Sequence, residues 1–504
     1  VAGFEEKGAG VSKAETILAI DQGTTSSRAI LFSVGGAVLD VQQKELKLYY
    51  PEKGWVEQKP DDIWDDTRTA CAKILEKCEK RPAAIGITNQ RETTIVWDRE
   101  TGEAVYNAIV WQDRRTAEVC AALKDQGYEA MVASKTGLLL DPYFSATKIA
   151  WILEHVPGAR ARAEAGELAF GTVDCYLLWK LTGGKVHATD VTNASRTMLY
   201  NIVEQCWDDD LLALFDISAS LLPEVRDNIA DFGVSDEETI GAALPIGGMA
   251  GDQQAALIGQ GCLTPGMIKS TYGTGCFVLI NIGSEFRRSQ NRLLTTPAYR
   301  VDGQIQYAIE GSIFVAGAAL QWLRDGLELF EDARETESLA YSVSDNNGVY
   351  FVPAFTGLGA PHWKPDARAM ITGMSRESTK AHVVRAALEA QAYQTLDLLG
   401  AMEDDGGHKA DVIRIDGGLA ANGFVCQFLA DMLQRPVEVP AVVETTAWGA
   451  ATLAGVQAGV FKDLEAVAQG WKAARRYGPQ MGAEARDALY DGWKAALSML
   501  LQEN

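Results

Sequence analysis

The sequence predicts an α/β protein built from two related domains that face each other across a cleft. Three observations support this fold class. The chain has 504 residues, and at roughly 150 residues per domain this length corresponds to two or three domains. Short apolar segments alternate with helical patterns, with glycine and proline residues between them. A pattern of strand, Gly/Thr turn and strand near the N-terminus recurs about 250 residues later.

The first unit begins with a hairpin. Residues 16–20 form a short apolar run that is typical of a buried strand, and residues 28–33 return as a second strand. The polar residues 21–27 lie between them and form the predicted turn. Gly35-Gly36 predicts a second hairpin turn directly after this pair of strands.

A helix is predicted from Pro60 onward. Proline suits the first helical turn, and Asp61 and Asp62 follow it at the end where the helix dipole favours negative charge. The residues that recur at helical spacing are Ile63, Thr67, Cys71, Ile74 and Cys78. Two further strands are predicted at residues 83–88 and 94–97.

The second unit repeats the layout of the first. Residues 266–280 contain a strand, the turn Gly273-Thr274-Gly275 and another strand. The repeat indicates two related α/β domains, with a ligand cleft between them. Coincidence is the alternative, because Gly/Thr hairpins are common.

Composition and charge exclude several classes of protein. The formal charge is −22, from 46 Lys and Arg against 68 Asp and Glu, so nucleic acid is an unfavourable partner. No apolar stretch approaches ~18 residues, which argues against insertion into a membrane. The N-terminus, with Glu5, Glu6 and Lys7 among glycines, lacks the apolar core of a signal peptide, and we expect it to be a short flexible leader.

Cysteines and histidines indicate neither a disulfide scaffold nor a zinc site. The eight cysteines include no C-x-x-C pair, so we interpret them as reduced thiols of a cytoplasmic protein. The five histidines show no i,i+4 pairing, which argues against a histidine-based zinc site. Any metal ion should therefore be held by carboxylates.

The turn that begins at Asp21 suggests phosphate chemistry. Gly23, Thr24, Thr25 and Ser26 would expose successive backbone N–H groups and three hydroxyl groups, which suit phosphate oxygens. Because phosphate would repel the Asp21 carboxylate, we infer that Mg²⁺ lies between them. A plain hairpin with a polar tip is the alternative. The P-loop motif and a complete G-x-G-x-x-G are both absent from the sequence.

Seven ordered blocks of the sequence resemble one family of enzymes. They are Asp21-Gln22-Gly23-Thr24-Thr25-Ser26-Ser27-Arg28, Gly86-Ile87-Thr88-Asn89-Gln90-Arg91-Glu92-Thr93-Thr94, Trp111-Gln112, Asp141-Pro142-Tyr143-Phe144-Ser145, Gly251-Asp252-Gln253-Gln254, Tyr272-Gly273-Thr274-Gly275-Cys276-Phe277 and Asp416-Gly417-Gly418. On these blocks the chain resembles the glycerol kinases, members of the FGGY family of carbohydrate kinases. The resemblance runs in order from about residue 16 to about residue 495.

The resemblance implies a fold and an activity. The fold would consist of two actin-like ATPase (ribonuclease H-like) domains, residues 14–260 and 261–504, facing each other across a catalytic cleft. The activity would be phosphorylation of a terminal glycerol hydroxyl by ATP, giving sn-glycerol 3-phosphate and ADP. Asp252 matches the family's catalytic base, and a carboxylate suits that role because a hydroxyl is a poor nucleophile. Asp21 joins Asp252 as a catalytic residue and as a ligand of Mg²⁺. A helix cap is the alternative role for Asp252.

The same resemblance implies the substrate contacts. A triol has a hydroxyl edge and a C–H edge, so its pocket needs polar partners on one side and aromatic surface on the other. The residues implied for glycerol binding are Arg91, Glu92, Tyr143, Asp252 and Gln253 on the polar side and Trp111 and Phe277 over the carbons. Arg91 and Glu92 must lie in a turn or at a strand end to reach one ligand, because neighbours in a regular strand point to opposite faces.

Further positions match the nucleotide site of the family. They are Thr24, Thr25, Ser26, Arg28, Thr274, Gly317, Gln321, Gly418 and Asn422. Glycine is expected there because a missing Cβ lets the backbone approach a ligand closely. For Gly317, helix packing is the alternative role.

Two departures from the family concern regulation. Some bacterial relatives bind an inhibitory sugar bisphosphate in a Gly-rich loop with an arginine, but residues 237–245 are acidic here and contain no basic residue. Other relatives are activated through a loop histidine, and no histidine lies between His187 and His362. We therefore expect neither control. A homodimer or homotetramer is plausible by resemblance.

Two rival functions share parts of this pattern. Another kinase of the family, acting on a pentulose or gluconate, would share the nucleotide loops but would need different pocket residues in place of Arg91, Glu92, Trp111 and Phe277. A non-enzymatic nucleotide switch of the chaperone type would lack a second small-ligand pocket and would carry an attached binding domain.

Overall fold

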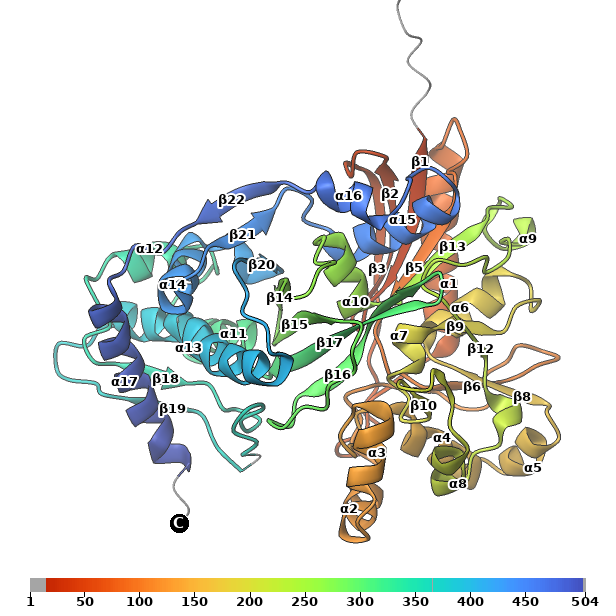
Figure 1. Cartoon of the computed structure of the whole chain (residues 1–504), viewed down its shortest axis with the longest axis horizontal. Coiled ribbons are helices and arrows are strands. Elements are labelled where there is room, and N and C mark those ends of the chain that lie inside the picture. Colours follow the sequence, from red (N-terminus) through yellow and green to blue (C-terminus); the bar gives the residue numbers. More distant parts are fainter. Residues whose placement is uncertain (1–14, 365, 502–504) are drawn as a thin grey trace, which may run out of the picture.

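The computed structural model describes residues 15–364 and 366–501 (Figure 1). Two β-sheets form its centre, and helices cover both of them. The expected N-terminal leader lies outside the described residues.

The first sheet has five strands. In their order across the sheet they are β13 (Ile246–Gly251), β5 (Ile85–Asn89), β1 (Thr16–Gln22), β2 (Ser26–Ser33) and β3 (Val38–Glu45). Strand β1 lies at the centre and is buried on both faces, as its apolar run predicts. Leu18 and Ile20 pack into one hydrophobic cluster, and Ile17 and Ala19 pack into another.

The second sheet has seven strands. In their order across the sheet they are β16 (Leu294–Val301), β17 (Gln304–Ile313), β15 (Cys276–Gly283), β14 (Ile268–Tyr272), β20 (Ile413–Asp416), β21 (Val437–Pro440) and β22 (Ala473–Tyr477). Strand β14 pairs antiparallel with β15 and parallel with β20, as β1 pairs with β2 and β5. The repeat seen in the sequence is therefore a repeat of topology, and coincidence does not explain it.

The first hairpin turn is shorter than the sequence suggests. Strand β1 extends through Gln22 and β2 begins at Ser26, so Asp21 and Gln22 belong to the ladder opposite Arg28 and Ser27. Polar side chains remain in a buried strand here because they have partners. The Gln22 side chain, for example, accepts a hydrogen bond of 3.0 Å from Thr67.

Helices of the first half cover one face of the first sheet and also form a region that lies below it in the view of Figure 1. Their bounds are α1 (Pro60–Lys77), α2 (Ala117–Asp125), α3 (Glu129–Thr136), α4 (Ser145–His155), α5 (Ala159–Glu164), α6 (Val173–Leu181), α7 (Val191–Ala194), α8 (Asp209–Phe215), α9 (Glu237–Ile240) and α10 (Asp252–Gly259). The predicted helix at Pro60 is confirmed as α1, which packs on β2 and β3. The predicted strands at 83–88 and 94–97 correspond to β5 and β6 (Ile95–Asp98).

The second half contains the remaining helices. Their bounds are α11 (Gly317–Asp325), α12 (Glu335–Tyr341), α13 (Lys380–Gly406), α14 (Gly423–Leu433), α15 (Thr445–Gln457), α16 (Leu464–Gln469) and α17 (Ala483–Leu501). Small two-stranded sheets complete the described fold: β4 (Glu57–Gln58) with β7 (Ala108–Ile109), β6 with β8 (Leu168–Gly171), β9 (Ala188–Asp190) with β12 (Glu224–Arg226), β10 (Tyr200–Asn201) with β11 (Cys206–Trp207), and β18 (Tyr350–Val352) with β19 (Met370–Thr372).

Helix α15 crosses from the second half of the chain onto the first sheet. It packs against β1, β5 and β13, so the blue helix lies beside the red strands in Figure 1. Ala447 and Trp448 of α15 share a hydrophobic cluster with Ile17 and Phe32. Helix α10 packs between α15 and the second sheet. A domain boundary at residue 260 stays a prediction. Helix α15 follows that boundary in the chain but packs on the first sheet.

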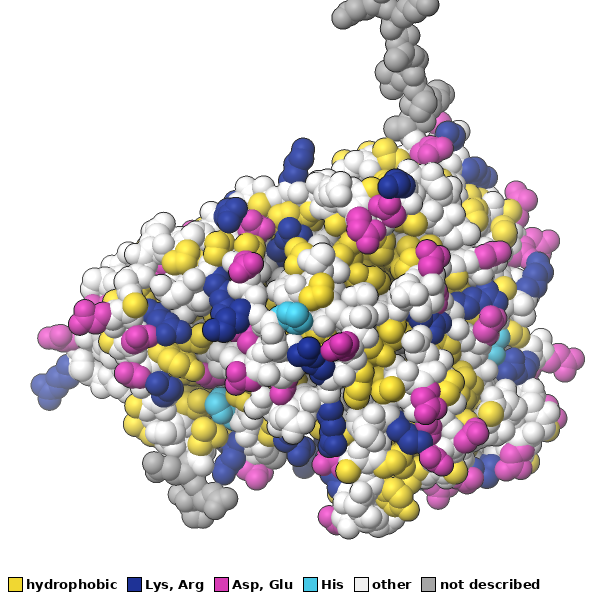
Figure 2. Space-filling model, viewed as in Figure 1, with side chains coloured by type: hydrophobic (Ala, Val, Ile, Leu, Met, Phe, Trp, Pro, Cys, Tyr) yellow, Lys and Arg dark blue, Asp and Glu magenta, His cyan; other side chains and the backbone are white. Residues whose placement is uncertain are grey.

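Charged side chains of both signs lie on the surface (Figure 2). Basic and acidic side chains are interspersed on the face shown in Figure 2, although the sequence is strongly acidic overall. Within the described ranges, every helix is too short or too polar to span a bilayer. The eight cysteines all lie in described segments and are unpaired.

Candidate active site

The first Gly/Thr turn, residues 23–25, is the first predicted phosphate turn, and its carbonyl groups anchor it. The carbonyl oxygens of residues 23–25 accept hydrogen bonds from inside the protein, and the donors are Gln90 at 3.3 Å, Gln58 at 2.6 Å and the backbone N–H of Leu46 at 2.8 Å. Carbonyls fixed in this way face away from a ligand, which leaves the amide side of the turn for an anion. The Thr25 side chain is exposed and Thr24 is half-buried.

Asp21 lies at the base of this turn, and its carboxylate interacts with the Arg28 guanidinium. The two form an ion pair, and the same guanidinium donates a hydrogen bond of 2.8 Å to Glu444, just before α15. Burial raises the pKa of Asp21, and the charge of Arg28 opposes this shift. Arg28 therefore ties the first turn to a helix from the other half of the chain.

The second turn meets the beginning of α11. The carbonyl of Gly273 accepts a hydrogen bond of 2.9 Å from the Gly317 N–H, and Thr274 accepts from Ala316 and Ala318. A Cβ at Gly317 would lie 2.6 Å from the Gly273 oxygen, so glycine is required by this contact. A helix that starts beside a Gly/Thr turn presents a favourable end to phosphate. Gln321 lies one turn further along α11 and is exposed.

The Asp416-Gly417-Gly418 block begins at the last residue of β20. Gly417 has a φ of 86°, and a Cβ there would lie 2.4 Å from the Tyr272 oxygen, which explains this glycine. Space around Gly418 is open, since a Cβ there would meet nothing within 4 Å. Asn422 caps α14 by accepting from the Val425 N–H at 3.1 Å, so its side chain has a structural partner as well as a predicted nucleotide role.

Arg91 and Glu92 occupy the turn that their shared role requires. Glu92 has a φ of 63°, in the left-handed region that is uncommon for non-glycine residues. The Thr93 N–H donates a hydrogen bond of 2.7 Å to the Arg91 carbonyl oxygen, which closes the turn. As a result, both side chains point to the same region. The Arg91 Nε lies 3.8 Å from the Glu92 carboxylate and 3.3 Å from that of Asp252.

Asp252 begins α10 at the carboxyl end of β13. Its Oδ1 accepts a hydrogen bond of 2.7 Å from the Gln253 N–H, while a third of its side chain stays exposed. Loss of solvation raises the pKa of Asp252, and the positive charges of Arg91 and Lys269 oppose that shift. The buried Lys269 donates a hydrogen bond to the Gln253 side chain from β14 of the second sheet.

Aromatic side chains border these charges. The rings of Trp111 and Tyr143 meet edge to face with centroids 5.5 Å apart. The Trp111 Nε1–H donates a hydrogen bond of 2.9 Å to the Thr24 hydroxyl. This bond connects the predicted glycerol residues to the first predicted phosphate turn. Phe277 lies at the start of β15, opposite Ser312, with a half-buried side chain.

Sequence reasoning missed three charged residues of this region. They are Arg196, Lys269 and Glu310, all of them at least 98% buried. Glu310 forms ion pairs with Arg91 and Arg196, and Arg196 also pairs with Glu92. A signal was present, since Lys269 follows Ile268 and Glu310 follows Ile309 within strands, and an unpaired charge buried beside such residues would be costly.

The donor set near the two turns consists of carboxylate oxygens. Among residues 15–364 and 366–501, no group of three or more His, Cys, Asp or Glu side chains is assembled for a metal ion. Asp21 and Asp252 could supply one oxygen ligand each, and Mg²⁺ commonly combines one or two carboxylates with water and phosphate oxygens. This chemistry fits a magnesium ion that arrives with a nucleotide.

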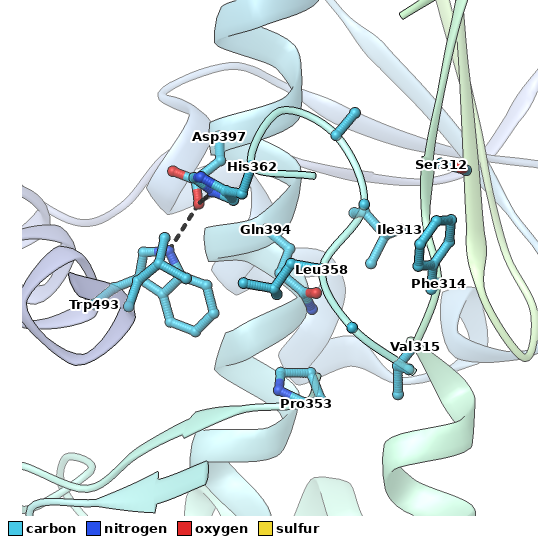
Figure 3. Close-up of a pocket in the computed structure, with 14 residues that line it drawn as sticks. Ser312, Ile313, Phe314, Val315, Pro353, Leu358, His362, Gln394, Asp397 and Trp493 are labelled. Carbon is cyan, nitrogen blue, oxygen red and sulfur yellow. Dashed lines mark hydrogen bonds and ion pairs between the residues drawn. The ribbon is translucent and has the colours of Figure 1, made fainter. Parts of the chain in front are cut away.

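A separate cavity lies inside the second domain (Figure 3). It is lined by the end of β17, the loop around Leu358 and His362, and Asp397 of α13. The Asp397 carboxylate accepts hydrogen bonds from Trp493 at 2.9 Å and Tyr490 at 2.5 Å. These contacts fasten α17 to α13, and none of the predicted site residues lines the cavity.

The folds of both halves match one enzyme family. The model of the FGGY family of carbohydrate kinases, N-terminal domain, matches residues 16–259, and that of the C-terminal domain matches residues 268–458. The chain therefore belongs to the FGGY family of carbohydrate kinases. It is a phosphotransferase with the two-domain, actin-like ATPase architecture that its repeated sheets display.

The relatives that are similar over nearly the whole chain include several glycerol kinases. The chain is 66% identical to a glycerol kinase of Nitrosomonas eutropha over 96% of this chain and 98% of the relative, and 57% identical to glycerol kinase 1 of Pseudomonas aeruginosa over 97% and 99%. The crystal structure of Plasmodium falciparum glycerol kinase with ADP is similar with a TM-score of 0.93 and 34% identity, covering 97% of this chain and 99% of that one. A gluconate kinase structure from Lactobacillus acidophilus shares the fold at 22% identity and a TM-score of 0.87, over 97% and 99% of the two chains.

Proposed function

We propose that this protein transfers the γ-phosphoryl group of ATP to a terminal hydroxyl group of glycerol, giving sn-glycerol 3-phosphate and ADP. One observation carries the proposal. Arg91, Glu92 and Asp252 converge beside the rings of Trp111 and Tyr143. The high identity to glycerol kinases supports the same substrate.

Asp252 acts as the general base. The hydroxyl that attacks the phosphorus atom must lose its proton, and a carboxylate within hydrogen-bonding reach accepts it during the attack. Partial burial raises the pKa of Asp252 and makes it a stronger base, while Arg91 and Lys269 favour its ionised form. The remaining exposure of Asp252 leaves room for a substrate to approach.

The pocket holds glycerol by matching its two edges. Arg91 donates hydrogen bonds, Glu92 accepts them, and the Tyr143 hydroxyl does either, so that the three hydroxyl groups of glycerol find complementary partners. The pKa of Tyr143 is raised strongly by burial, which keeps its hydroxyl protonated and able to donate. Trp111 and Phe277 cover the carbon atoms, and Gln253 completes the polar side.

The two Gly/Thr turns hold the phosphates of ATP. The residues assigned to the nucleotide are Thr24, Thr25, Ser26, Arg28, Thr274, Gly317, Gln321, Gly418 and Asn422. The anchored carbonyls of the first turn and the start of α11 beside the second support this assignment. In phosphoryl transfer such groups position the phosphates and offset their charge.

Mg²⁺ is part of the proposal, with Asp21 and Asp252 as the protein groups that would hold it. When bound, it neutralises charge on the phosphate oxygens. A cytoplasmic location is also proposed, because none of the eight cysteines is paired.

The experiment that tests the function is ADP release by the purified protein with ATP and Mg²⁺. Glycerol is compared with xylulose, gluconate and no acceptor. We expect release that depends strictly on glycerol. Release without an acceptor, or only with another sugar, would refute the assignment of the pocket.

The Asp252→Asn variant tests the base. Asparagine keeps a side-chain oxygen that can accept the hydrogen bond from the Gln253 N–H, but it cannot take up the proton. We expect kcat to fall by about 10²- to 10⁴-fold with glycerol binding largely retained. The control is Asp236→Asn, which changes another aspartate at a helix start, one that accepts from Glu238 N–H at 3.1 Å. Near wild-type turnover in Asp252→Asn would exclude Asp252 as the base.

A further inference from the structure

Two arginines of the first domain converge on one carboxylate of the second. Glu310 lies on β17, and its two oxygens accept hydrogen bonds of 2.6 and 2.9 Å from Arg91. Arg196, which follows α7, donates a third hydrogen bond of 3.2 Å to Glu310. The side chains of all three residues are at most 2% exposed, so water does not screen these contacts.

Arg196 also contacts the predicted glycerol residues directly. Its Nε–H donates a hydrogen bond of 2.5 Å to the Glu92 carboxylate. Its guanidinium lies 5.6 Å from the centre of the Tyr143 ring. Its remaining nitrogen, Nη1, is buried and has no hydrogen-bond partner. Arg196 therefore has one donor available in the same region as the substrate residues.

The four charges close into a ring of alternating sign. From Glu92 the contacts run to Arg196, to Glu310, to Arg91 and back to Glu92 at 3.8 Å. The ring itself is neutral, so loss of any one member leaves an uncompensated buried charge. Such a ring fixes the orientation of its members more strictly than a single pair does, because each arginine is held by two carboxylates.

If these ion pairs served only to hold the two domains together, they would not need to include residues of the proposed substrate pocket. Here Arg91 and Glu92 are the residues proposed to bind glycerol, and Glu92 is held in an unfavourable backbone conformation with a φ of 63°. Arg91 in turn lies 3.3 Å from Asp252, so its orientation also affects the proposed base.

We propose that Arg196 and Glu310 are positioning residues of the substrate pocket, and that Glu310 makes the glycerol affinity depend on the second domain. This inference rests on the proposed function. Burial alone would raise the pKa of Glu310, but Arg196 and Arg91 outweigh it and lower the pKa to about 2. Glu310 therefore remains charged throughout the physiological pH range, so the ring acts as a constant part of the pocket.

The test compares Glu310→Gln and Arg196→Lys with a matched control. Glu389→Gln removes the charge of another fully buried carboxylate, which pairs with Arg385 at 2.7 Å on α13. For each protein, ADP release is measured while glycerol and ATP are varied separately, and the melting temperature is recorded. Lysine retains the charge of Arg196 but lacks the fork that reaches two carboxylates.

We expect Glu310→Gln and Arg196→Lys each to raise KM for glycerol at least tenfold, with KM for ATP within twofold of wild type. Glu389→Gln should leave both constants within twofold even where it lowers the melting temperature. The single variant Arg196→Gln is measured in the same way. The double variant Arg196→Gln with Glu310→Gln restores neutrality, so its rise in glycerol KM should be smaller than the product of the rises in Arg196→Gln and Glu310→Gln alone. If Glu310→Gln does not fold, the KM values of Arg196→Lys for glycerol and ATP, compared with those of Glu389→Gln, decide.

Two results would overturn the inference. The first is a glycerol KM in Glu310→Gln and Arg196→Lys no different from that of Glu389→Gln. The second is an equal rise of both KM values in proportion to lost thermal stability, which would assign these residues to the domain interface alone. A wild-type protein that turns over xylulose or gluconate instead of glycerol would refute the proposed function. The same comparison with that acceptor would then decide the inference.

Discussion

The contact between α10 and α15 offers a direct test of how the fold sets the catalytic geometry. Gly449 of α15 lies against the backbone of α10, and a Cβ at this position would be 1.9 Å from the Ala255 carbonyl oxygen. Real Cβ atoms almost never approach closer than 3.0 Å, and the obstacle is backbone rather than a flexible side chain. Gly449→Ala must therefore separate the two helices by about 1 Å.

This displacement has two expected consequences. Overpacking of a core contact costs about 1–3 kcal/mol, and a backbone obstacle places the cost at the upper end of that range. Ala255 lies three residues after Asp252, about 4.5 Å along the same short helix. A shift of about 1 Å at the reacting groups lowers kcat by about 100-fold. Gly449→Ala should therefore lose about 3 kcal/mol of stability and most of its turnover.

The assay combines urea unfolding with ADP release in the presence of glycerol. Gly400→Ala is the matched control, because Gly400 lies in the exposed surface of α13 and a Cβ there would meet nothing within 4 Å. We expect this control to gain about 0.5–1 kcal/mol, since alanine favours helix, and to keep wild-type activity. Wild-type stability and turnover in Gly449→Ala would show that the α10–α15 contact does not position Asp252.

Three further predictions concern other parts of the molecule. Burial and, to a smaller extent, the negative charge of Asp190 raise the pKa of Asp174 to about 7. The folded protein therefore keeps Asp174 protonated where the unfolded chain ionises it, so the free energy of unfolding falls as the pH rises from about 4 to about 7. Asp174→Asn should therefore gain stability relative to wild type across that interval, and a constant difference in urea midpoints would contradict this. Asp397→Ala should cost about 2–4 kcal/mol, because Tyr490 and Trp493 lose their acceptor, and an unchanged melting curve would exclude that role. Fructose 1,6-bisphosphate should leave the rate unchanged, since residues 237–245 carry no positive charge, whereas saturable inhibition would reveal a basic site elsewhere.

Local patterns allowed much of the fold to be predicted. The apolar run of β1 and the proline and acidic start of α1 are encoded by neighbouring residues, so both elements were expected close to their observed bounds. The first turn was predicted too long, because polar residues such as Gln22 can belong to a buried strand when a distant side chain, here Thr67, supplies a hydrogen bond. No local pattern contains that partner.

The ordered motifs also indicated the enzyme family and the candidate residues Arg91, Glu92 and Asp252. Their chemistry follows from residue type, and the required turn at Arg91 and Glu92 follows from the geometry of a strand. The roles of these residues stay proposals until the variants are measured. The membership of the family is established over both halves of the chain.

The sequence by itself determined the strands around the two Gly/Thr turns, the helix at Pro60 and, through seven ordered motifs, the family, because each of these patterns is made of residues close together in the chain. The tertiary structure decided how the site is held. Glu310 meets Arg91 across 219 positions and Arg196 across 114, and Arg28 reaches Glu444 across 416. Contacts at such separations depend on how the two sheets and α15 pack, and a buried charge acquires its partner only when that packing is complete.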